Sequence, residues 1–349
     1  MRQTEQSGAM TTPLLPPLRV LAPEDLIASV PHILGFHPDD SLVVMAMHEH
    51  NLTFTMRVDL PLARHRRPLA EQLLIPIREH QPTSVLLLVF GGVGTADPPE
   101  ELPHKKLIDV LDDAVDSIGV AVAHAVWVQS CQTGAPWYCY DDIDCGGTMP
   151  DPSSSPVAAA SAAAGIVTFS NRAEMAALVA PAPDDVLARR SALLDEAVEE
   201  QRIATAAGIR LVRDAVGEFP SRTNPLTDDE IVRLLMALSD DRVRDASLSF
   251  SIGPTSAAAE HLWLEMTRGC PAPERADPAT LLAFTAYLRG DGGLASVALH
   301  AAETACPGHR LAGLLRHALD CGLAPARIRA LAQGAAQEAA WHLAAGAQQ

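Results

Sequence analysis

One imidazole and two carboxylates stand within four residues near the start of the chain, in the string His37-Pro38-Asp39-Asp40. Placed just before a strand, such a set can bind a divalent cation or exchange protons with a substrate. The same string suits a type I turn, because Pro favours the second position of that turn and Asp follows it well. Asp40 or Ser41 then bonds the backbone that enters the strand. We favour the turn and keep the site as the alternative.

Arg57 and Asp59 form a second charged pair at the end of a predicted strand over 52–58, and being two residues apart they share one face. A first strand over 42–47 is joined to it by the polar link 48–51, which predicts a hairpin. Residue 42 then lies opposite roughly residue 57, so both charges finish beside the turn. The predicted ligand-binding cluster consists of His37, Asp39, Asp40, Arg57 and Asp59. It can bind a polar ligand or close the sheet edge as an ion pair, and we favour the structural role.

Soft metal ligands gather further along the chain, where Cys131, Cys139 and Cys145 follow His124. The cysteines are separated by seven and five residues, unlike the tight spacings of structural zinc sites. We therefore expect free, partly buried cysteines, no metal essential for folding, and no cofactor that the sequence can name.

Two further strings bear on phosphate binding. Gly91-Gly92-Val93-Gly94 stands at the carboxyl end of a predicted central strand, where open α/β sheets bind ligands. A phosphate-cradling loop needs a helix directly after the glycines, and Ala96–Pro99 intervene. The arginines of the run 64–67 can hold a phosphate group, although a solvated face is the commoner role of such a run. The sequence contains no nucleophile elbow, Walker motif or His-Glu-x-x-His string.

The elements that must position these residues follow an α/β pattern. Residues 83–90 are an unbroken apolar run, which fits a strand covered on both faces. Helical patterns at 62–80 and 101–117 flank it, and a strand at 120–128 follows. This alternation predicts an N-terminal α/β domain, whose sheet is mixed because of the opening hairpin. A short helix from Pro23 should stop before a second proline at position 31.

The rest of the chain is predicted to be an α-helical domain. Thr227 and Glu230 form a capping box, with Leu226 and Ile231 placed as its hydrophobic staple. Residues 282–307 match a tetratricopeptide unit at its small and apolar positions, but no second copy follows, so we expect a helical hairpin packed on its neighbours. The predicted organisation is a disordered leader over 1–17, an α/β domain over 18–150, a linker or loop over 151–164 and the α-helical domain over 165–345.

Composition excludes several classes of protein. A net charge of −17 argues against nucleic-acid binding, which needs a basic face. The cysteine spacing fits no secreted disulfide framework, and the N-terminus lacks the apolar stretch of a signal peptide. No window approaches the ~20 apolar residues that span a bilayer. We therefore expect a cytoplasmic protein with no membrane and no nucleic-acid partner.

Several strings together resemble the actinobacterial family known as domain of unknown function 4192, over about residues 18–325. They are Gly35–Leu42, Arg57–Pro61, Val243–Ala246, Leu281–Gly292 and Pro307–Ala312. Family members often carry a paired-cysteine string after a Tyr/Cys strand; here Cys139 is kept and the later position reads Asp144-Cys145. The resemblance implies membership and no activity.

Two functions are consistent with these patterns. The first is a non-catalytic binding or regulatory protein whose helical domain presents a surface to another protein. The alternative is a metal- or nucleotide-dependent enzyme with its site at the predicted cluster, His37, Asp39, Asp40, Arg57 and Asp59.

Overall fold

The computed structural model describes residues 23–49, 51–92, 101–142, 144–163, 166–200 and 203–345. The chain divides into two compact units. The sheet unit takes the chain up to Ile33 and then Pro38–Thr168, and the helical unit takes Leu34–His37 and the residues from Phe169 onward. The leader predicted over residues 1–17 lies outside the described residues.

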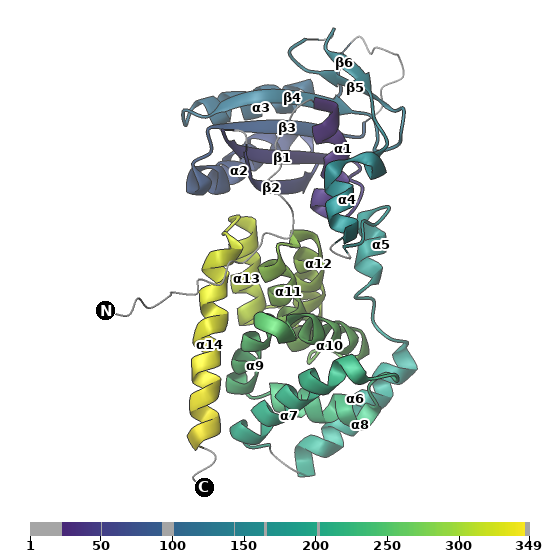
Figure 1. The fold of residues 1–349 in the computed structure, drawn as a ribbon, viewed down its shortest axis with the longest axis vertical. Helices are drawn as coiled ribbons and strands as arrows, with labels where there is room; N and C mark the ends of the chain where they lie inside the picture. The colour runs from purple at the N-terminus through teal and green to yellow at the C-terminus, as the bar shows by residue number, and fades with distance from the viewer. Residues whose placement is uncertain are drawn as a thin grey trace, which may run out of the picture. The chain divides into compact units, whose positions relative to one another are not determined.

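The sheet unit is built on a mixed six-stranded sheet in the order β2-β1-β3-β4-β5-β6 (Figure 1). Strands β3 and β4 are parallel, and every other neighbouring pair is antiparallel. The α/β fold with a mixed sheet, predicted from sequence, is confirmed. The strands are β1 (Ser41–His48), β2 (Asn51–Asp59), β3 (Ser84–Phe90), β4 (Ala121–Val128), β5 (Pro136–Cys139) and β6 (Gly146–Thr148).

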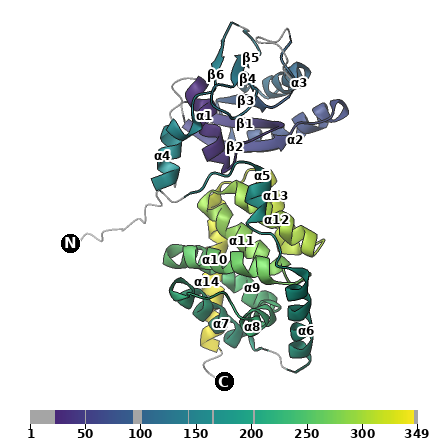
Figure 2. The same cartoon turned by 90° about the vertical axis from the view of Figure 1, so that its right-hand side faces the viewer.

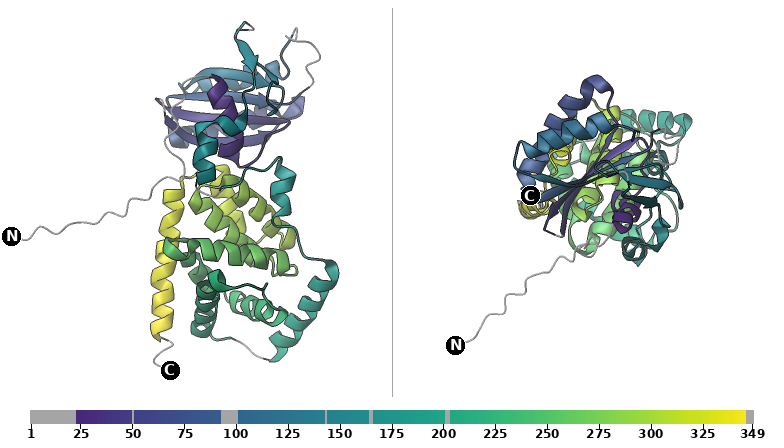
Figure 3. Two further views of the ribbon diagram at one scale, coloured as in Figure 1. Left: turned by 45° about the vertical axis from the view of Figure 1, so that its right-hand side comes forward. Right: turned by 90° about the horizontal axis from the view of Figure 1, so that it is seen from above.

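Helices cover both faces of this sheet. Helices α2 (Arg66–His80) and α3 (Lys105–Asp116) lie on one face, and α1 (Pro23–Leu34) and α4 (Pro156–Ala163) lie on the other (Figures 2 and 3). Strand β3 is therefore buried along nearly its whole length, as its unbroken apolar run predicts. His32 of α1 bonds Thr168 Oγ1 at 2.8 Å and Pro152 O at 2.9 Å, which ties the residues after β6 to this unit.

One local prediction in the sheet unit is wrong. Helix α1 does not stop before Pro31 but runs through it to Leu34, because the burial of Ile27 and Val30 outweighs the one missing backbone hydrogen bond. The β1–β2 hairpin forms as predicted, and Leu42 pairs with Val58, one residue from the approximate partner predicted. A β-bulge next to Ala46 inserts one extra residue into β2, which shifts the register by one.

The helical unit is centred on α11 (Ala276–Arg289), in which twelve of fourteen residues are buried. It packs most extensively against α12 (Gly292–Ala305) and then α10 (Ser256–Gly269). The expected helical hairpin over 282–307 is present as α11 and α12, and its likeness to a tetratricopeptide unit stays a prediction. The other helices are α5 (Arg172–Ala177), α6 (Asp184–Glu200), α7 (Thr205–Glu218), α8 (Asp228–Leu238), α9 (Asp241–Ser247), α13 (Arg310–Asp320) and α14 (Pro325–Ala345). None of the described helices combines the length and the apolar character that crossing a membrane requires.

The capping box predicted for α8 is confirmed. The hydroxyl of Thr227 accepts from Glu230 N at 3.3 Å, and a Glu230 carboxylate oxygen accepts from Thr227 N at 2.8 Å. Two of the unsatisfied donors at the helix start are therefore paired within the cap.

We expect Thr227→Ala to lower the free energy of unfolding of the helical unit by about 1 kcal/mol, because α8 loses this cap. Urea denaturation followed by far-ultraviolet circular dichroism measures the change. Thr227→Ser keeps the accepting hydroxyl and serves as the matched control. An equal loss in both variants would show that the methyl group, and not the cap, stabilises the helix.

Candidate functional site

Four strands meet at one edge of the sheet unit. Ser41, the first residue of β1, pairs with Asp59 at the end of β2 and with Phe90 at the end of β3. Phe90 in turn pairs with Val128 at the end of β4. Helices α2 and α3 also begin here, since each follows a strand that ends at this edge. We call this region the carboxyl edge, after the carboxyl ends of the parallel strands β3 and β4.

Arg57 and Asp59 hold the carboxyl edge together. Arg57 Nη1 lies 2.6 Å from Asp59 Oδ1, and Arg57 Nε donates to Ser41 Oγ at 2.8 Å. The hydroxyl of Ser41, a fully buried residue, donates in turn to Asp39 O at 2.5 Å. The side chain of Arg57 is only 16% exposed, whereas that of Asp59 is 84% exposed. These contacts link the end of β2 to the turn before β1.

Asp39 and Asp40 occupy that turn. Asp39 Oδ1 accepts from Asp40 N at 3.1 Å, so the turn bond comes from the first aspartate. Asp40 has φ +42°, in the left-handed region that Asp tolerates better than most residues. Its carboxylate lies over Gly91, where a Cβ would stand 2.7 Å from Asp40 Oδ1. The end of β3 therefore needs a glycine at this position.

His37, the remaining member of the predicted cluster, belongs to the helical unit. Its backbone N–H donates to Phe169 O at 3.0 Å, and Phe36 pairs with Phe169 as an isolated parallel bridge. Asp39, Asp40, Arg57 and Asp59 belong to the sheet unit. The convergence of all five residues stays a prediction.

Two basic residues that sequence reasoning did not connect lie at the carboxyl edge. His104 precedes α3 and faces Gly92, where a Cβ would stand 3.5 Å from His104 Nε2. Burial lowers the pKa of His104 below its usual 6.5, the charge of Arg66 lowers it further, and the charge of Asp40 opposes both. Arg66 opens α2, and its Nε is buried without a hydrogen-bond partner among the described residues.

The sequence contains little that identifies Arg66 and His104 as parts of one site. Arg66 stands in the arginine run 64–67, which raised the possibility of phosphate binding without distinguishing one arginine from the others. His104 stands in the string Pro-His-Lys-Lys, which carries no recognisable chemistry. Only the crossover topology brings the starts of α2 and α3 to one edge.

All six cysteines are free. Cys131 is buried and its Sγ donates to Pro38 O at 3.6 Å, while Cys145 is half-buried. Within the ranges that the structure describes, no group of three or more His, Cys, Asp or Glu side chains is arranged to hold a metal ion. The expectation that no metal is essential for folding stays a prediction.

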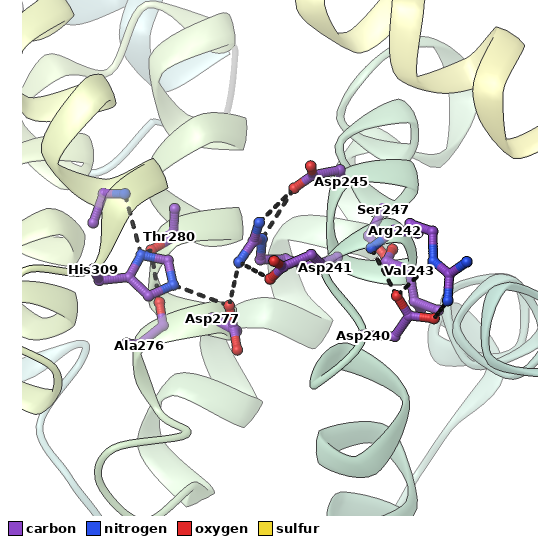
Figure 4. A network of polar contacts seen from close by, with 12 residues as sticks. Asp240, Asp241, Arg242, Val243, Asp245, Ser247, Ala276, Asp277, Thr280 and His309 are labelled. Carbon is purple, nitrogen blue, oxygen red and sulfur yellow. Dashed lines mark hydrogen bonds and ion pairs between the residues drawn. The ribbon is translucent and has the colours of Figure 1, made fainter. Parts of the chain in front are cut away.

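The helical unit contains a second polar network, which joins α9, α11 and the start of α13 (Figure 4). Asp277 Oδ1 lies 3.6 Å from Arg244 Nη1 and 3.0 Å from His309 Nε2. Arg244 also pairs with Asp241 and Asp245, each at 2.8 Å.

The imidazole in this network caps a helix. His309 Nδ1 accepts from the backbone N–H of Ala312 at 3.2 Å, so the ring proton lies on Nε2 and points to Asp277. Because both ring nitrogens are engaged, this His–Asp pair serves structure and is not poised as a general base.

A family model described as a domain of unknown function (DUF4192) matches residues 23–326. The chain belongs to the DUF4192 family. No match was found among curated proteins or among solved structures. The predicted membership is therefore confirmed, and the family description specifies no activity.

The strings that resemble DUF4192 proteins fall on both polar clusters. The string from Arg57 to Pro61 ends β2 at the carboxyl edge. Val243–Ala246 and Pro307–Ala312 contribute Arg244, Asp245 and His309 to the network of Figure 4. In this DUF4192 chain, residues of these strings therefore make polar contacts that join separate elements of the fold.

The positive φ of Asp40 leads to a stability prediction. Asp40→Ala should lower the free energy of unfolding by about 1 kcal/mol, because alanine disfavours the left-handed conformation. Asp40→Gly should be neutral or stabilising, since glycine adopts positive φ freely. Urea titrations of the two variants beside the parent protein make the comparison. Equal destabilisation by Ala and Gly would mean that the carboxylate, and not the backbone, matters there.

Proposed function

We propose that the sheet unit binds a small phosphate-bearing molecule of the nucleotide class at its carboxyl edge. The main support for this proposal is Arg66, whose Nε is buried and has no hydrogen-bond acceptor among the described residues. A buried donor left unpaired costs about 1–3 kcal/mol, and an acceptor that a ligand supplied to this atom would remove that cost. A phosphate group is a good acceptor for a guanidinium, because two of its oxygens can accept parallel hydrogen bonds from the planar guanidinium fork.

The surroundings of Arg66 support an anion. Helices α2 and α3 both begin at this edge, and helix starts carry partial positive charge and unpaired N–H groups. Gly92 has φ +89° and no side chain, so Pro103 and His104 pack closely against the backbone after β3. His104 faces the same glycine and becomes a second cation when it is protonated.

Asp39 and Asp40 indicate which kind of phosphate-bearing ligand suits the carboxyl edge. Asp39 and Asp40 are exposed at the same edge, and their carboxylates repel a bare anion. They accept hydrogen bonds from hydroxyl or amino groups, as carboxylates do in many sugar and base contacts. A ligand that combines a phosphate with such donors satisfies both kinds of residue, and nucleotides have this combination. The proposal concerns binding and includes no catalytic step.

This proposal predicts that Arg66→Ala weakens binding of ATP by about tenfold or more, since one charge-assisted contact is worth about 1.5–3 kcal/mol. Isothermal titration calorimetry on the full chain measures the affinity. Arg67→Ala is the matched control, because Arg67 is exposed and adjacent in sequence. Equal affinities in the parent, R66A and R67A proteins would refute the site.

His104 supplies a pH test within the same experiment. Its pKa lies below 6.5 in the free protein, and a bound anion favours the protonated imidazole. Sulfate, whose own charge is constant near neutral pH, should therefore bind more tightly as the pH falls through and below 6.5. His104→Gln should flatten this dependence.

A protein-binding surface on the helical unit is a second candidate. The support for this candidate is two exposed apolar side chains on α14. Leu331 is 52% exposed and Trp341 is 65% exposed. Trp341 lies opposite the buried side of the helix, which contains Ala332 and Ala339, and Leu331 flanks that side. By contrast α11 is almost wholly buried, so the predicted hairpin cannot supply the surface through that helix.

A photo-reactive side chain at position 341 tests this second candidate. We expect it to cross-link a protein partner of defined mass in cells, because an exposed tryptophan is typical of interface centres. The same group at position 336, an exposed site on another side of α14, is the control. Identical cross-linking from both positions, or from neither, would count against a specific surface.

A further inference from the structure

Two cysteines face each other across the β5–β6 hairpin. In the register of this pair, Trp137 lies opposite Gly147 and Tyr138 lies opposite Gly146. The next pair in the same register is Cys139 and Cys145, and Cys139 N donates to Cys145 O at 2.8 Å. The two residues are therefore direct cross-strand partners.

This placement suits a disulfide bond. Directly opposed residues of antiparallel strands have Cα atoms about 4.5–5.5 Å apart. Disulfides usually span Cα separations of about 4.4–6.8 Å, and opposed side chains lie on one face of the sheet. The Cys145 thiol lies close enough to raise the pKa of Cys139. No backbone rearrangement is needed to bring the sulfur atoms together.

We propose that Cys139 and Cys145 form a redox site that closes to a disulfide by exchange with a small-molecule disulfide. The two residues differ in access, because Cys139 is 6% exposed and Cys145 is half-buried. Burial, and then the nearby thiol of Cys145, raise the pKa of Cys139 to about 12, so this residue remains a thiol near neutral pH. Cys145 is accordingly the residue that attacks first, and Cys139 resolves the intermediate.

The exchange balances in two steps. Cys145 loses its proton to solvent and attacks one sulfur of the small-molecule disulfide, whose S–S bond breaks and releases one thiolate. Cys139 then gives its proton to that thiolate and attacks Cys145 Sγ, which expels the second thiolate to be protonated by solvent. Two protein thiols are oxidised to one disulfide, and one small-molecule disulfide is reduced to two thiols.

The other thiols of the chain provide the controls. Cys131 is buried with its Sγ directed to Pro38 O, and it should take no part. Cys306 and Cys321 are half-buried and can react independently with the same oxidant. The test therefore uses the full chain with Cys306→Ser and Cys321→Ser as the parent background.

The experiment incubates the reduced protein with oxidised glutathione, blocks the remaining thiols by alkylation and measures the intact mass. The parent should lose two alkylatable thiols and two hydrogens, gain no glutathione, and recover on treatment with dithiothreitol. Digestion with a protease that cleaves after aromatic residues then locates the bond. Cleavage after Tyr140 separates Cys139 from Cys145, and cleavage after Trp137 separates both from Cys131.

Variants distinguish this site from adventitious oxidation. Cys139→Ser should leave Cys145 carrying one glutathione, because the resolving thiol is missing, whereas Cys131→Ser should still form the bond. Cys145→Ser, a change at a half-buried position, should abolish the reaction without affecting the fold. A parent protein that keeps a glutathione adduct, or that links either residue to Cys131, would overturn the proposal.

Discussion

Strand β1 pairs antiparallel on both of its sides, and the arrangement of the sheet unit depends on this double pairing. Because β2 and β3 both run opposite to β1, they end where β1 begins, and the parallel strand β4 ends there too. The helices that follow β2 and β3 then start at the same edge. One pairing pattern thereby brings Arg66, His104, Asp40 and two glycines into one neighbourhood.

The helical unit depends on a different constraint, the burial of one helix among its neighbours. The two residues of α11 that are not buried are Asp277 and Arg289, one near each end. Asp277 contacts Arg244 and His309, while Arg289 pairs with Glu260 and with Asp291, which caps α12. The apolar middle of α11 provides the packing, and its charged ends fix which helices pack against it. The ion pairs of this unit thus determine which helices pack together more than they raise the free energy of unfolding.

The features that could be predicted from the sequence are those encoded within a few residues. The apolar run at 83–90 and the Thr227–Glu230 box each act locally, so their strand and helix start follow from sequence. The shift of the β1–β2 register by one residue was not predictable, because the bulge in β2 opposite Ala46 depends on how the two strands twist together. Arg66 and His104 could not be predicted as neighbours. The crossover between distant strands brings them together, and no sequence motif contains both residues.

The short pairing between Gly35–His37 and Phe169 has a consequence for how the protein is made. Phe169 N donates to Gly35 O at 2.8 Å, and His37 N donates to Phe169 O at 3.0 Å, so the helical unit is discontinuous in sequence. On the ribosome, residues 34–37 emerge between two segments of the sheet unit, and their partner Phe169 appears only after the entire sheet unit has been synthesised. The two units are therefore interleaved in sequence, and a single cut after residue 168 leaves residues 34–37 of the helical unit on the fragment that contains the sheet unit.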